Sequence, residues 1–534
     1  MARLKRNLTH VLEQPYIPLV TAAQMQILDQ RTINEAKIPG LTLMERAGKG
    51  VVQTLKQQCG SPSGKFIVVF CGKGNNGGDG LVIARLLTQL RANVHIILLA
   101  KPKELTKDAL SMYRRVRKIS RPAIIHQEPS EKTIRTVTAR GEILVDALLG
   151  TGLSTPVKGP YRTAINLMNA SQVPIIAVDL PSGIHGDTGL TLGVAVKAQS
   201  TVTFGCPKIG LFLGNAIDHA GIITTVDIGI PQQYVEEIQS PVHLLTPESI
   251  AHLLPARNLS SHKGTYGHVG VIAGSPGKTG SATLTARATL RTGAGLVTVA
   301  TPQSAQASMD AKLLEAMTHA MPETKSQTLG RAALIPLINF AKERDAIALG
   351  PGLGTHADTG IVIRQLLPRL QEPCVIDADG LNVLAGHLRV LSSCTRMPIL
   401  TPHPGEMARL LNKASAEVIN ANRLGFALQL ATRYKVIVVL KGARTLIAAP
   451  DGQTAICATG NPGMASAGMG DALTGVIVSL LAQGLSPWDA ARAGVCLHGL
   501  AGDLAAETLG EASMIASDLI EHLPHAFQEI LSHR

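Results

Sequence analysis

Two glycine-rich segments, each closed by an aspartate ahead of a helical pattern, contain the residues best suited to chemistry in this chain. Residues 71–80 have the sequence CGKGNNGGDG, and residues 463–475 have the sequence GMASAGMGDALTG. Loops with so few side chains leave backbone N–H groups free to surround an anion, and a helix start adds positive potential. Asp79 stands at the predicted start of one helix, and Asp471, in the first turn of the other, is placed to take a proton from a hydroxyl that attacks phosphate. A plain helix cap is the alternative for each.

The first segment contains residues 72–77, GKGNNG, which match the GxGxxG fingerprint of dinucleotide-binding folds. That fingerprint also needs an acid at the end of the next strand, where residues 100–103 are AKPK, so ordinary NAD binding is disfavoured. The longer string NNGGDG adds amides and a carboxylate, which suit phosphate and a cation. Asp146 and Asp179 end two later predicted strands, where an acid could act as a base, hold a metal or only cap the next helix.

Three further segments of the second half could bind a nucleotide or its substrate. Residues 441–445, KGART, link two predicted strands, and their basic side chains could lie against phosphates, although a plain hairpin turn is the alternative. Residues 401–406, TPHPGE, fix His403 between two prolines, although a lone histidine is more often structural. Residues 350–354, GPGLG, form a flexible loop at a strand end. The sequence contains no complete P-loop, GxSxG or HExxH motif.

The elements that must position these segments are alternating strands and helices. Short apolar runs such as FIVVF (66–70) alternate with helical patterns such as GLVIARLLTQL (80–90), and a second series begins at HVGVIAGS (268–275). This alternation predicts parallel α/β sheets, whose ligands lie at the carboxyl ends of the strands. The proline-rich, polar segment 231–250 interrupts the pattern. We therefore expect two three-layer α/β domains, residues 1–240 and 241–534.

Composition favours a cytoplasmic protein that binds small anions. Hydrophobic residues make up 45% of the 534 residues, with 52 glycines, which suits buried parallel strands and close helix packing. The net charge of +12 is dispersed and lacks interleaved aromatic residues, so nucleic acid is not the expected partner. The seven cysteines show no CxxC spacing, which indicates free thiols and no zinc site. Neither a signal peptide nor a membrane-length apolar run is predicted.

The motifs, taken in order, resemble those of a known enzyme family. NNGGDG, DALLGTG and DLPSG look like the NAD(P)H-hydrate epimerase family. TPHPGE, KGART and GNPGMASAGMGDALTG look like the ADP-dependent NAD(P)H-hydrate dehydratase family, which has a ribokinase-like fold. The two in this order, over about residues 20–525, resemble the bifunctional NAD(P)H-hydrate repair family. The resemblance implies a Rossmann-like epimerase sheet followed by a ribokinase-like sheet.

The resemblance also implies a reaction, the repair of NADH and NADPH that have gained water across the nicotinamide ring. The first domain would interconvert the R and S hydrates, NADHX and NADPHX. The second would use ADP to phosphorylate the hydroxyl of the S form, releasing AMP and phosphate and restoring the reduced ring. K⁺ in the epimerase site, Mg²⁺ with the nucleotide and a homo-oligomer are implied, with no nucleic-acid or membrane partner.

Two other functions compete with this interpretation. A small-molecule kinase of the ribokinase-like class is one, and TPHPGE and KGART weigh against it. A non-catalytic nucleotide-binding or RNA-associated N-terminal domain is the other, and the intact NNGGD with Asp146 and Asp179 weighs against it.

Site residues are carried over from the family by the same resemblance. The epimerase substrate would be bound by Asn75, Asn76, Gly77, Gly78, Asp79, Gly150, Thr151, Gly152, Leu153, Ser154, Thr155, Pro156, Tyr161 and Asp179, with Asp179 as the proton shuttle. Asn76, Asp146 and Ser182 would coordinate K⁺. The dehydratase substrate would contact Ala282, Gly352 or Gly354, His403 and Asp471, with Asp471 as the base. The nucleotide would be held by Lys441, Gly442, Ala443, Arg444, Thr445 and Gly470.

Two positions depart from the family's pattern. Ala467 stands where the family commonly has glycine, and an alanine there costs about 1 kcal/mol if the position needs a positive φ. Gly468 and Gly470 remain, so we expect the anion-binding loop to survive. Gly380 stands where the family often has alanine, and we expect little effect from it.

Overall fold

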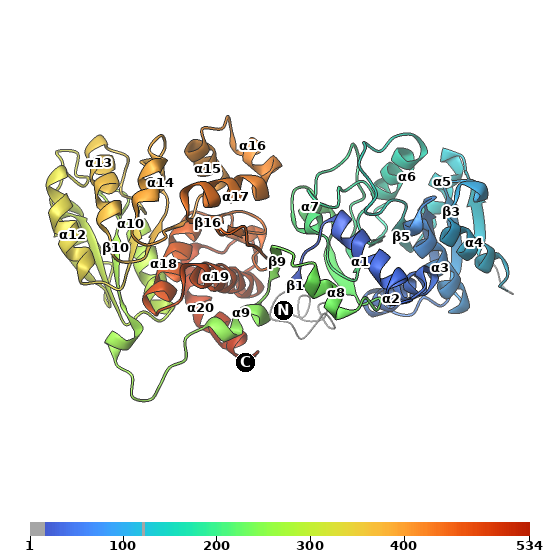
Figure 1. The fold of residues 1–534 in the computed structure, drawn as a ribbon, viewed down its shortest axis with the longest axis horizontal. Coiled ribbons are helices and arrows are strands. Elements are labelled where there is room, and N and C mark those ends of the chain that lie inside the picture. The colour runs from blue at the N-terminus through green and yellow to red at the C-terminus, as the bar shows by residue number, and fades with distance from the viewer. Residues whose placement is uncertain (1–16, 120–122) are drawn as a thin grey trace. The chain divides into compact units, whose positions relative to one another are not determined.

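The computed structural model describes residues 17–119 and 123–534, which divide into two compact units, residues 17–242 and residues 243–534 (Figure 1). The basic N-terminal segment, for which the sequence predicts no signal peptide, lies outside the described residues. Among the described residues, no helix combines the length and the apolar character needed to cross a bilayer.

The N-terminal unit is built on a parallel sheet in the order β4-β3-β2-β5-β6-β7-β8. Its strands are β2 (Phe66–Cys71), β3 (Asn93–Leu98), β4 (Ile124–Gln127), β5 (Ile143–Ala147), β6 (Ile175–Val178), β7 (Ser200–Phe204) and β8 (Ile222–Val226). The chain adds strands outward from β2 to β4 and then returns to β5 on the other side of β2. The loops after β2 and β5 therefore diverge, and this switch point is where doubly wound sheets bind ligands.

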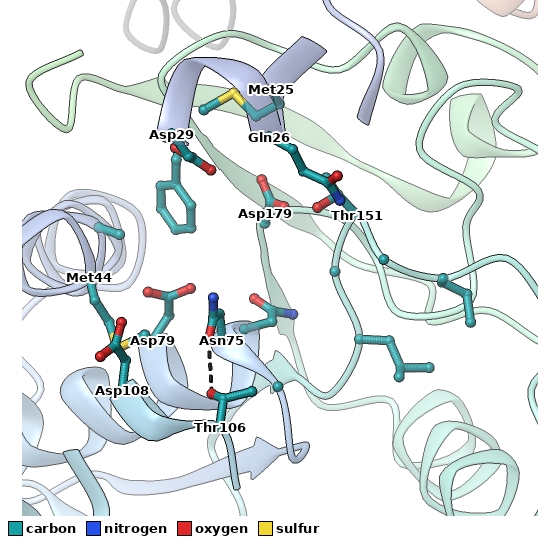
Figure 2. A pocket seen from close by; sticks show the side chains of 18 of the residues that line it. Met25, Gln26, Asp29, Met44, Asn75, Asp79, Thr106, Asp108, Thr151 and Asp179 are labelled. Carbon is teal, nitrogen blue, oxygen red and sulfur yellow. Dashed lines mark hydrogen bonds between the residues drawn. The ribbon is translucent and has the colours of Figure 1, made fainter. Parts of the chain in front are cut away.

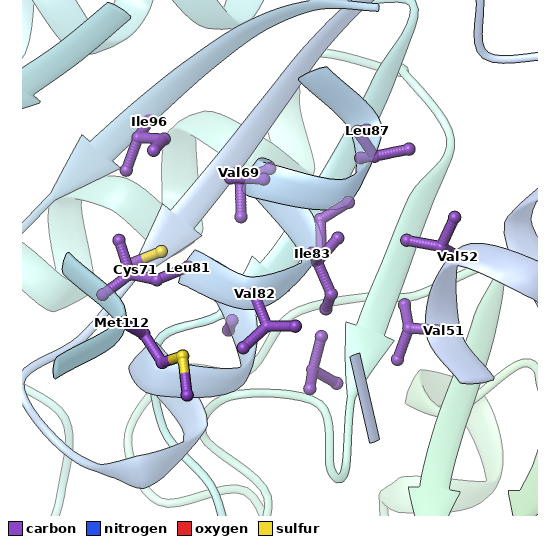
Figure 3. Packing of buried hydrophobic residues seen from close by; sticks show 14 of the residues in the cluster. Val51, Val52, Val69, Cys71, Leu81, Val82, Ile83, Leu87, Ile96 and Met112 are labelled. Carbon is purple, nitrogen blue, oxygen red and sulfur yellow. The ribbon is translucent and has the colours of Figure 1, made fainter. Parts of the chain in front are cut away.

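Helices cover both faces of this sheet because its central strands are buried on both sides. Ile67 and Val69 of β2 pack in one cluster with α2, α3 and α4, part of which Figure 3 shows. Phe66 and Phe70 pack in a second cluster with α5 and α6. The helices of this unit are α1 (Ala22–Asn34), α2 (Gly40–Cys59), α3 (Asn75–Gln89), α4 (Lys107–Arg117), α5 (Glu131–Ala139), α6 (Gly159–Ala170), α7 (Ala216–His219) and α8 (Gln232–Glu237). Pro39 stands between α1 and α2, as the N-cap of α2.

The C-terminal unit contains a larger mixed sheet, which runs β9-β18-β17-β16-β15-β14-β13-β10-β11-β12. Its strands are β9 (Val242–Leu245), β10 (His268–Ile272), β11 (Leu296–Pro302), β12 (Met317–Met321), β13 (Ala346–Leu349), β14 (Cys374–Ile376), β15 (Ile399–Leu400), β16 (Ile437–Leu440), β17 (Leu446–Ala448) and β18 (Thr454–Cys457). The strands from β12 to β16 are parallel, and β16, β17 and β18 are antiparallel. A second switch point lies between β10 and β13.

One helix of the C-terminal unit, α18, contacts β13 and β14 and packs between α10 and α19. Elsewhere on the sheet, α17 contacts β16 and β17 (Figure 1). The helices of this unit are α9 (Pro247–Ile250), α10 (Thr279–Arg291), α11 (Gln303–Asp310), α12 (Leu334–Lys342), α13 (Ala357–Leu366), α14 (Asp379–Asn382), α15 (Pro404–Leu411), α16 (Ala416–Ala421), α17 (Arg423–Tyr434), α18 (Met469–Ala482), α19 (Pro487–Leu509) and α20 (Ala516–Leu531). Ser486 caps α19, since its side chain accepts a hydrogen bond from the Asp489 N–H. Two α/β units, as predicted, are therefore present.

Candidate active sites

A cavity of about 630 Å³ opens at the switch point of the N-terminal sheet, beyond the carboxyl ends of β2, β5 and β6 (Figure 2). Its lining includes most of the predicted epimerase residues, namely Asn75, Asn76, Asp79, Gly150, Thr151, Gly152, Leu153, Ser154, Thr155, Tyr161 and Asp179. Gly77, Gly78 and Pro156 are not among the lining residues. The sequence motifs at these strand ends thus converge on one cavity.

The glycines of the first loop join the two diverging strands closely. A methyl group at Gly72 would lie 2.0 Å from the Leu148 carbonyl oxygen, and one at Gly77 would lie 2.0 Å from the Gly72 carbonyl oxygen. Only glycine fits at either position without a backbone shift. Gly74 is the N-cap of α3, so Asp79 lies inside the helix and is not its cap. The capping interpretation of Asp79 is therefore wrong, and its carboxyl group is available to the cavity.

The two asparagines at the start of α3 have different surroundings. The Thr106 hydroxyl donates a hydrogen bond of 2.9 Å to Asn75 Oδ1, which holds that amide at the cavity wall (Figure 2). Both side-chain polar atoms of Asn76 are buried, and neither has a hydrogen-bond partner within the described chain. A buried amide left in that state costs about 1–3 kcal/mol, so the position suits a bound ligand or ion.

Asp146 and Ser182, the other predicted K⁺ ligands, are buried and hydrogen-bonded to each other. The Asp146 carboxylate accepts hydrogen bonds from the Ser182 hydroxyl at 2.6 Å and the Ser182 N–H at 2.8 Å. Burial raises the pKa of Asp146 to about 6 despite these hydrogen bonds. A carboxylate, a hydroxyl and the partnerless amide of Asn76 form a set of hard oxygen donors, which fits an alkali or alkaline-earth cation.

Asp179 follows β6 in a strained conformation, with φ of 68° in the left-handed region. Its Oδ1 accepts hydrogen bonds from Lys208 Nζ at 2.6 Å and from the Thr203 hydroxyl at 3.2 Å. The Lys208 side chain is only 1% exposed, and its ammonium also donates to the Phe204 carbonyl oxygen at 3.0 Å. These contacts fix the direction of the Asp179 carboxylate.

Asp29 of α1 and Lys208 line the same cavity, although the sequence did not single them out. Burial raises the pKa of Asp29 to about 6, with Lys208 opposing this and Asp179 adding to it. Burial also raises the pKa of Asp79 well above its ordinary value, and the charges of Asp179 and Asp29 raise it further. The cavity therefore holds three interacting carboxyl groups around one buried ammonium.

In the C-terminal unit, the ends of β14 and β16 and the start of α18 meet around a second buried ammonium. Lys441 Nζ lies 2.6 Å from Asp377 Oδ1 and 3.8 Å from Glu406 Oε2. The other carboxylate oxygen of Asp377 accepts a hydrogen bond of 2.9 Å from the Thr474 hydroxyl. A methyl group at Gly470 would lie 3.1 Å from Lys441 Nζ, so the glycine loop runs close over the ammonium.

The charges of this second site are tuned by burial and by one another. Burial alone would lower the pKa of Lys441, but the carboxylates of Asp377 and Glu406 raise it, so the side chain is an ammonium. Burial raises the pKa of Asp471 to about 6, and the Asp377 charge adds to this, while a hydrogen bond with Ser281 opposes it. At neutral pH, Asp471 is therefore a carboxylate that takes up a proton more readily than an ordinary aspartate.

The residue immediately before α18 has a left-handed conformation and is a glycine. Gly468 is the helix N-cap with φ of 87°, whereas Ala467 is not among the residues with positive φ. The strain considered for Ala467 from the sequence is therefore absent. Because Gly468 occupies the cap position, Asp471 lies in the first turn, and the interpretation of Asp471 as the cap is wrong.

His403 is held by the start of α15. Its Nδ1 accepts hydrogen bonds from the backbone N–H groups of Gly405 at 3.0 Å and Glu406 at 3.4 Å. Burial lowers the pKa of His403, with the Glu406 charge opposing, so the ring is neutral at pH 7. A neutral imidazole that accepts at Nδ1 carries its proton on Nε2, and that N–H can donate to a ligand.

The KGART segment is the turn between β16 and β17, and a buried arginine supports it from behind. Arg423 of α17 donates hydrogen bonds to the carbonyl oxygens of Ala443 at 2.5 Å and Leu440 at 3.0 Å. Gly442 has φ of 134°, and Arg444, with φ of 55°, donates to the Ala458 carbonyl oxygen. The hairpin interpretation is thus structurally correct, and the turn also brings Lys441 to the strand-end site.

The remaining predicted residues lie on the loops around the second switch point. The Gly352 carbonyl oxygen accepts a hydrogen bond of 2.8 Å from the Ser275 hydroxyl, and the Gly354 N–H donates one of 2.8 Å to Asp379. Ala282 is fully buried in α10, beneath the loop that follows β10. A methyl group at Gly380 would lie 2.9 Å from the Leu349 carbonyl oxygen, so glycine fits this backbone better than alanine.

Comparison with known proteins matches one protein family within each of the two units of the chain. Residues 40–210 match the family model described as YjeF-related protein N-terminus, and residues 269–525 match that of NAD(P)H-hydrate dehydratase. The chain is 44% identical to the bifunctional NAD(P)H-hydrate repair enzyme of Moorella thermoacetica, over 96% of this chain and 97% of that protein. It is 36% identical to the corresponding enzyme of Escherichia coli, over 91% and 90%. The chain belongs to the bifunctional NAD(P)H-hydrate repair enzyme family.

A solved structure is also similar to part of this NAD(P)H-hydrate repair family member. The ADP/ATP-dependent NAD(P)H-hydrate dehydratase from Bacillus subtilis, co-crystallised with ATP/Mg²⁺, is 28% identical. It covers 53% of this chain and 97% of its own length, with a TM-score of 0.45. The family resemblance inferred from the sequence motifs is confirmed by the full-length relatives.

The motifs missed several residues of this repair-family chain that the structure brings to its two sites. Asp29, Lys208 and Asp377 stand in no motif, and each gains its partners from segments distant in the chain. A weak signal existed for Asp377, which directly follows the apolar residues of β14 at the ligand-binding edge of its sheet. The strand ahead of Lys208, β7, has the sequence STVTF and gives no such signal. Asp29 lies within α1, where only the fold reveals which way its side chain faces.

Proposed function

We propose that this protein repairs hydrated NADH and NADPH in two steps, epimerisation in the N-terminal unit and ADP-dependent dehydration in the C-terminal unit. The observation that carries this proposal is full-length similarity to bifunctional NAD(P)H-hydrate repair enzymes. The geometry supports it, because each unit has a glycine-rich helix start, a strand-end aspartate and a lysine that pairs with it beyond the carboxyl ends of the parallel strands.

In the N-terminal unit, the start of α3 would bind the phosphates and ribose of the hydrate through Asn75–Asp79. The loop from Gly150 to Pro156 and the Tyr161 side chain would enclose the other side, and Asp179 would move the proton. The arrangement of Asn76, Asp146 and Ser182 fits a potassium ion, which would supply positive charge beside the substrate phosphates. Such an ion would also satisfy the partnerless amide of Asn76.

In the C-terminal unit, the nucleotide would lie against the turn Lys441–Thr445 and Gly470, with the Lys441 ammonium neutralising phosphate charge. The hydrate would contact His403, Gly352 or Gly354 and the loop above Ala282. Asp471 would take the proton of the ring hydroxyl as its oxygen attacks the β-phosphate of ADP, and AMP would leave. Breaking the C–O bond of the phosphorylated hydrate then releases phosphate, and loss of a neighbouring ring proton restores the reduced nicotinamide.

Mg²⁺ would accompany the nucleotide. The described residues contain no group of three or more His, Cys, Asp or Glu side chains arranged to hold a metal. Mg²⁺ commonly retains waters and binds substrate phosphates through one or two carboxylates, so it needs no such protein cage.

Incubation of mixed R and S hydrates with ADP, Mg²⁺ and K⁺ tests both steps at once. Recovery of the full nicotinamide absorbance, with one inorganic phosphate per restored ring, is expected. Recovery that stops at the S fraction would contradict the epimerase assignment. A stable phosphorylated product without phosphate release would instead indicate a kinase and contradict the dehydratase assignment. Replacing ADP by ATP in a parallel reaction determines which nucleotide this chain uses.

A further inference from the structure

Glu406, in the first turn of α15, is a buried carboxylate that contacts two different parts of the C-terminal site. Its Oε2 accepts a hydrogen bond of 2.9 Å from the His403 N–H and lies 3.8 Å from Lys441 Nζ. Its Oε1 lies 3.6 Å from His403 Nε2. The Glu406 side chain is 6% exposed, whereas the side chains of His403 and Lys441 are 50% and 18% exposed. One buried charge therefore lies behind two groups that a ligand can reach.

The structural role of Glu406 as part of a capping box does not account for these contacts. A capping box needs only an acceptor oxygen at the third helical position, which glutamine supplies as well as glutamate. The distances of 3.8 Å to Lys441 Nζ and 3.6 Å to His403 Nε2 are too long for hydrogen bonds, so these contacts act through charge. A neutral side chain would keep the cap and lose both of them.

The backbone holds the two parts of the site at a fixed separation. The Lys441 N–H donates a hydrogen bond of 2.9 Å to the Pro402 carbonyl oxygen, which continues the parallel pairing of β15 with β16. Asp377 Oδ1 lies 2.6 Å from Lys441 Nζ and holds the ammonium from the other side. A ligand at Lys441 can therefore act on His403 through charge without a change in the loop.

The charges that face His403 come from three elements. Glu406 and Arg409 belong to α15, and the other two, Lys441 and Asp377, follow β16 and β14. Burial lowers the pKa of His403 most, the cations Lys441 and Arg409 lower it further, and the two carboxylates oppose this. Phosphates bound at Lys441 would offset its positive charge and leave the negative charge of Glu406 to act on the ring. The His403 Nε2–H would then be a stronger hydrogen-bond donor.

We propose that Glu406 is a positioning residue that couples the two substrates of the dehydratase, so that a nucleotide held at Lys441 tightens the binding of the hydrate at His403. This inference rests on the dehydratase function and the substrate contacts proposed above. Because coupling between two sites is reciprocal, the hydrate must tighten nucleotide binding by the same factor. We expect a factor of about 5 to 10, at the lower end of the usual range. The complex that holds both substrates is thereby favoured over a complex that holds only one.

Calorimetric titration of the full chain with α,β-methylene-ADP and Mg²⁺ measures this coupling, because the bridging carbon of this analogue prevents phosphoryl transfer. The Kd of the analogue is measured alone and with a saturating mixture of R and S hydrates, and it should be about 5- to 10-fold lower with the hydrates. Equal Kd values in wild type would overturn the proposal. Failure of ADP and hydrate to give any phosphate release would instead overturn the dehydratase function, so the two failures are distinguishable.

Substitutions separate the charge of Glu406 from its capping role. Glu406→Gln keeps an acceptor for the His403 N–H and removes the charge, so the ratio of the two Kd values should approach one. Glu406→Asp keeps the charge on a shorter side chain and should retain part of the coupling. Glu417→Gln, at an exposed first-turn glutamate of α16, is the matched control and should keep the wild-type ratio. A wild-type ratio in Glu406→Gln, or an equal loss in Glu406→Gln and Glu406→Asp, would overturn coupling by charge.

Histidine NMR gives a readout that helix capping does not change. Adding α,β-methylene-ADP to wild type should raise the pKa of His403, since the phosphates offset the Lys441 charge, and Glu406→Gln should lower it. His403→Asn identifies the resonance by its absence. The measurement on wild type needs no Glu406 variant, so it decides the proposal even if the substitution prevents folding. A His403 pKa that the bound analogue leaves unchanged would overturn the link between the two sites.

Discussion

Replacing Asp377 by asparagine separates charge from shape at the dehydratase site. Asp377 is 1% exposed and Lys441 is 18% exposed, and their charged atoms are 2.6 Å apart. An asparagine would keep the volume, an acceptor for Lys441 and a partner for Thr474. The substitution therefore removes one negative charge and little else.

The expected cost follows from the burial of the pair. Removing one partner of a buried ion pair costs about 3–5 kcal/mol, and the retained hydrogen bonds favour the lower end, about 3 kcal/mol of unfolding free energy. Asp377 is the strongest of the influences that raise the pKa of Lys441, so that pKa will fall in the variant. An ammonium that moves by about 1 Å or loses its charge should lower kcat/KM about 100-fold, which corresponds to about 2.7 kcal/mol.

Phosphate release from ADP and the S hydrate measures this effect. The epimerase rate of the same chain is an internal control, because Asp377 lies in the C-terminal unit and should not affect it. Asp451→Asn, at an exposed turn between β17 and β18, is the matched variant and should behave as wild type. An Asp377→Asn protein that retains wild-type kcat/KM would refute the assignment of Asp377 as the residue that positions Lys441.

Four further outcomes follow from the same structure. Gly72→Ala should lower the melting temperature of the N-terminal unit well below that of wild type, because the added methyl group would lie 2.0 Å from a carbonyl oxygen. Gly74→Ala is the control, since the added methyl group would meet open space and φ is −86°, and its melting temperature in calorimetry should stay within about 2 °C of wild type. Dehydratase kcat/KM should rise with pH through an apparent pKa near 6, since Asp471 must be ionised to accept a proton, and a profile flat between pH 5 and 7 would contradict its role as the base. Folding raises the pKa of Asp471 from 3.8 to about 6, so the stabilisation that comes from its bound proton is full below pH 4 and is lost as pH rises through 6. Asp471→Asn should therefore raise the free energy of unfolding at pH 8 by up to about 3 kcal/mol, measured by urea titration. Gly468→Ala should abolish phosphate release, because φ at residue 468 is 87°. Ala467→Gly should leave phosphate release unchanged and lower the free energy of unfolding by about 0.5–1 kcal/mol. Faster phosphate release in Ala467→Gly would show that the loop does need a glycine at residue 467.

The sequence predicted the central strands well because they are buried on both faces. FIVVF and VIVVL are continuous apolar runs, and the structure contains them as β2 and β16. The peripheral strands β4 and β12 were not predicted, because β4 and β12 are largely half-buried or exposed and include polar residues such as His126 and His319. An edge strand takes its conformation from one neighbour, so its own sequence contains little of the signal.

The parts of the candidate sites that a short sequence motif forms by itself could be predicted, whereas ion pairs between residues far apart in the sequence could not. The helix starts at Asn75 and Met469 follow from their glycine-rich sequences. The pairs Lys208–Asp179 and Lys441–Asp377 do not, since the latter residues are 64 positions apart and meet only when β14 and β16 join one sheet. Each isolated lysine or aspartate has no periodicity or spacing that would distinguish it from a surface residue.

The contact between Gly72 and Leu148 has a consequence for how the N-terminal unit loses activity. The loop that would hold the coenzyme rests directly on the neighbouring strand's backbone, without a flexible linker that could fray first. Heating or denaturant should therefore remove the binding surface and separate β2 from β5 in a single event. An inactive but still folded form of this unit should not accumulate on the way to unfolding.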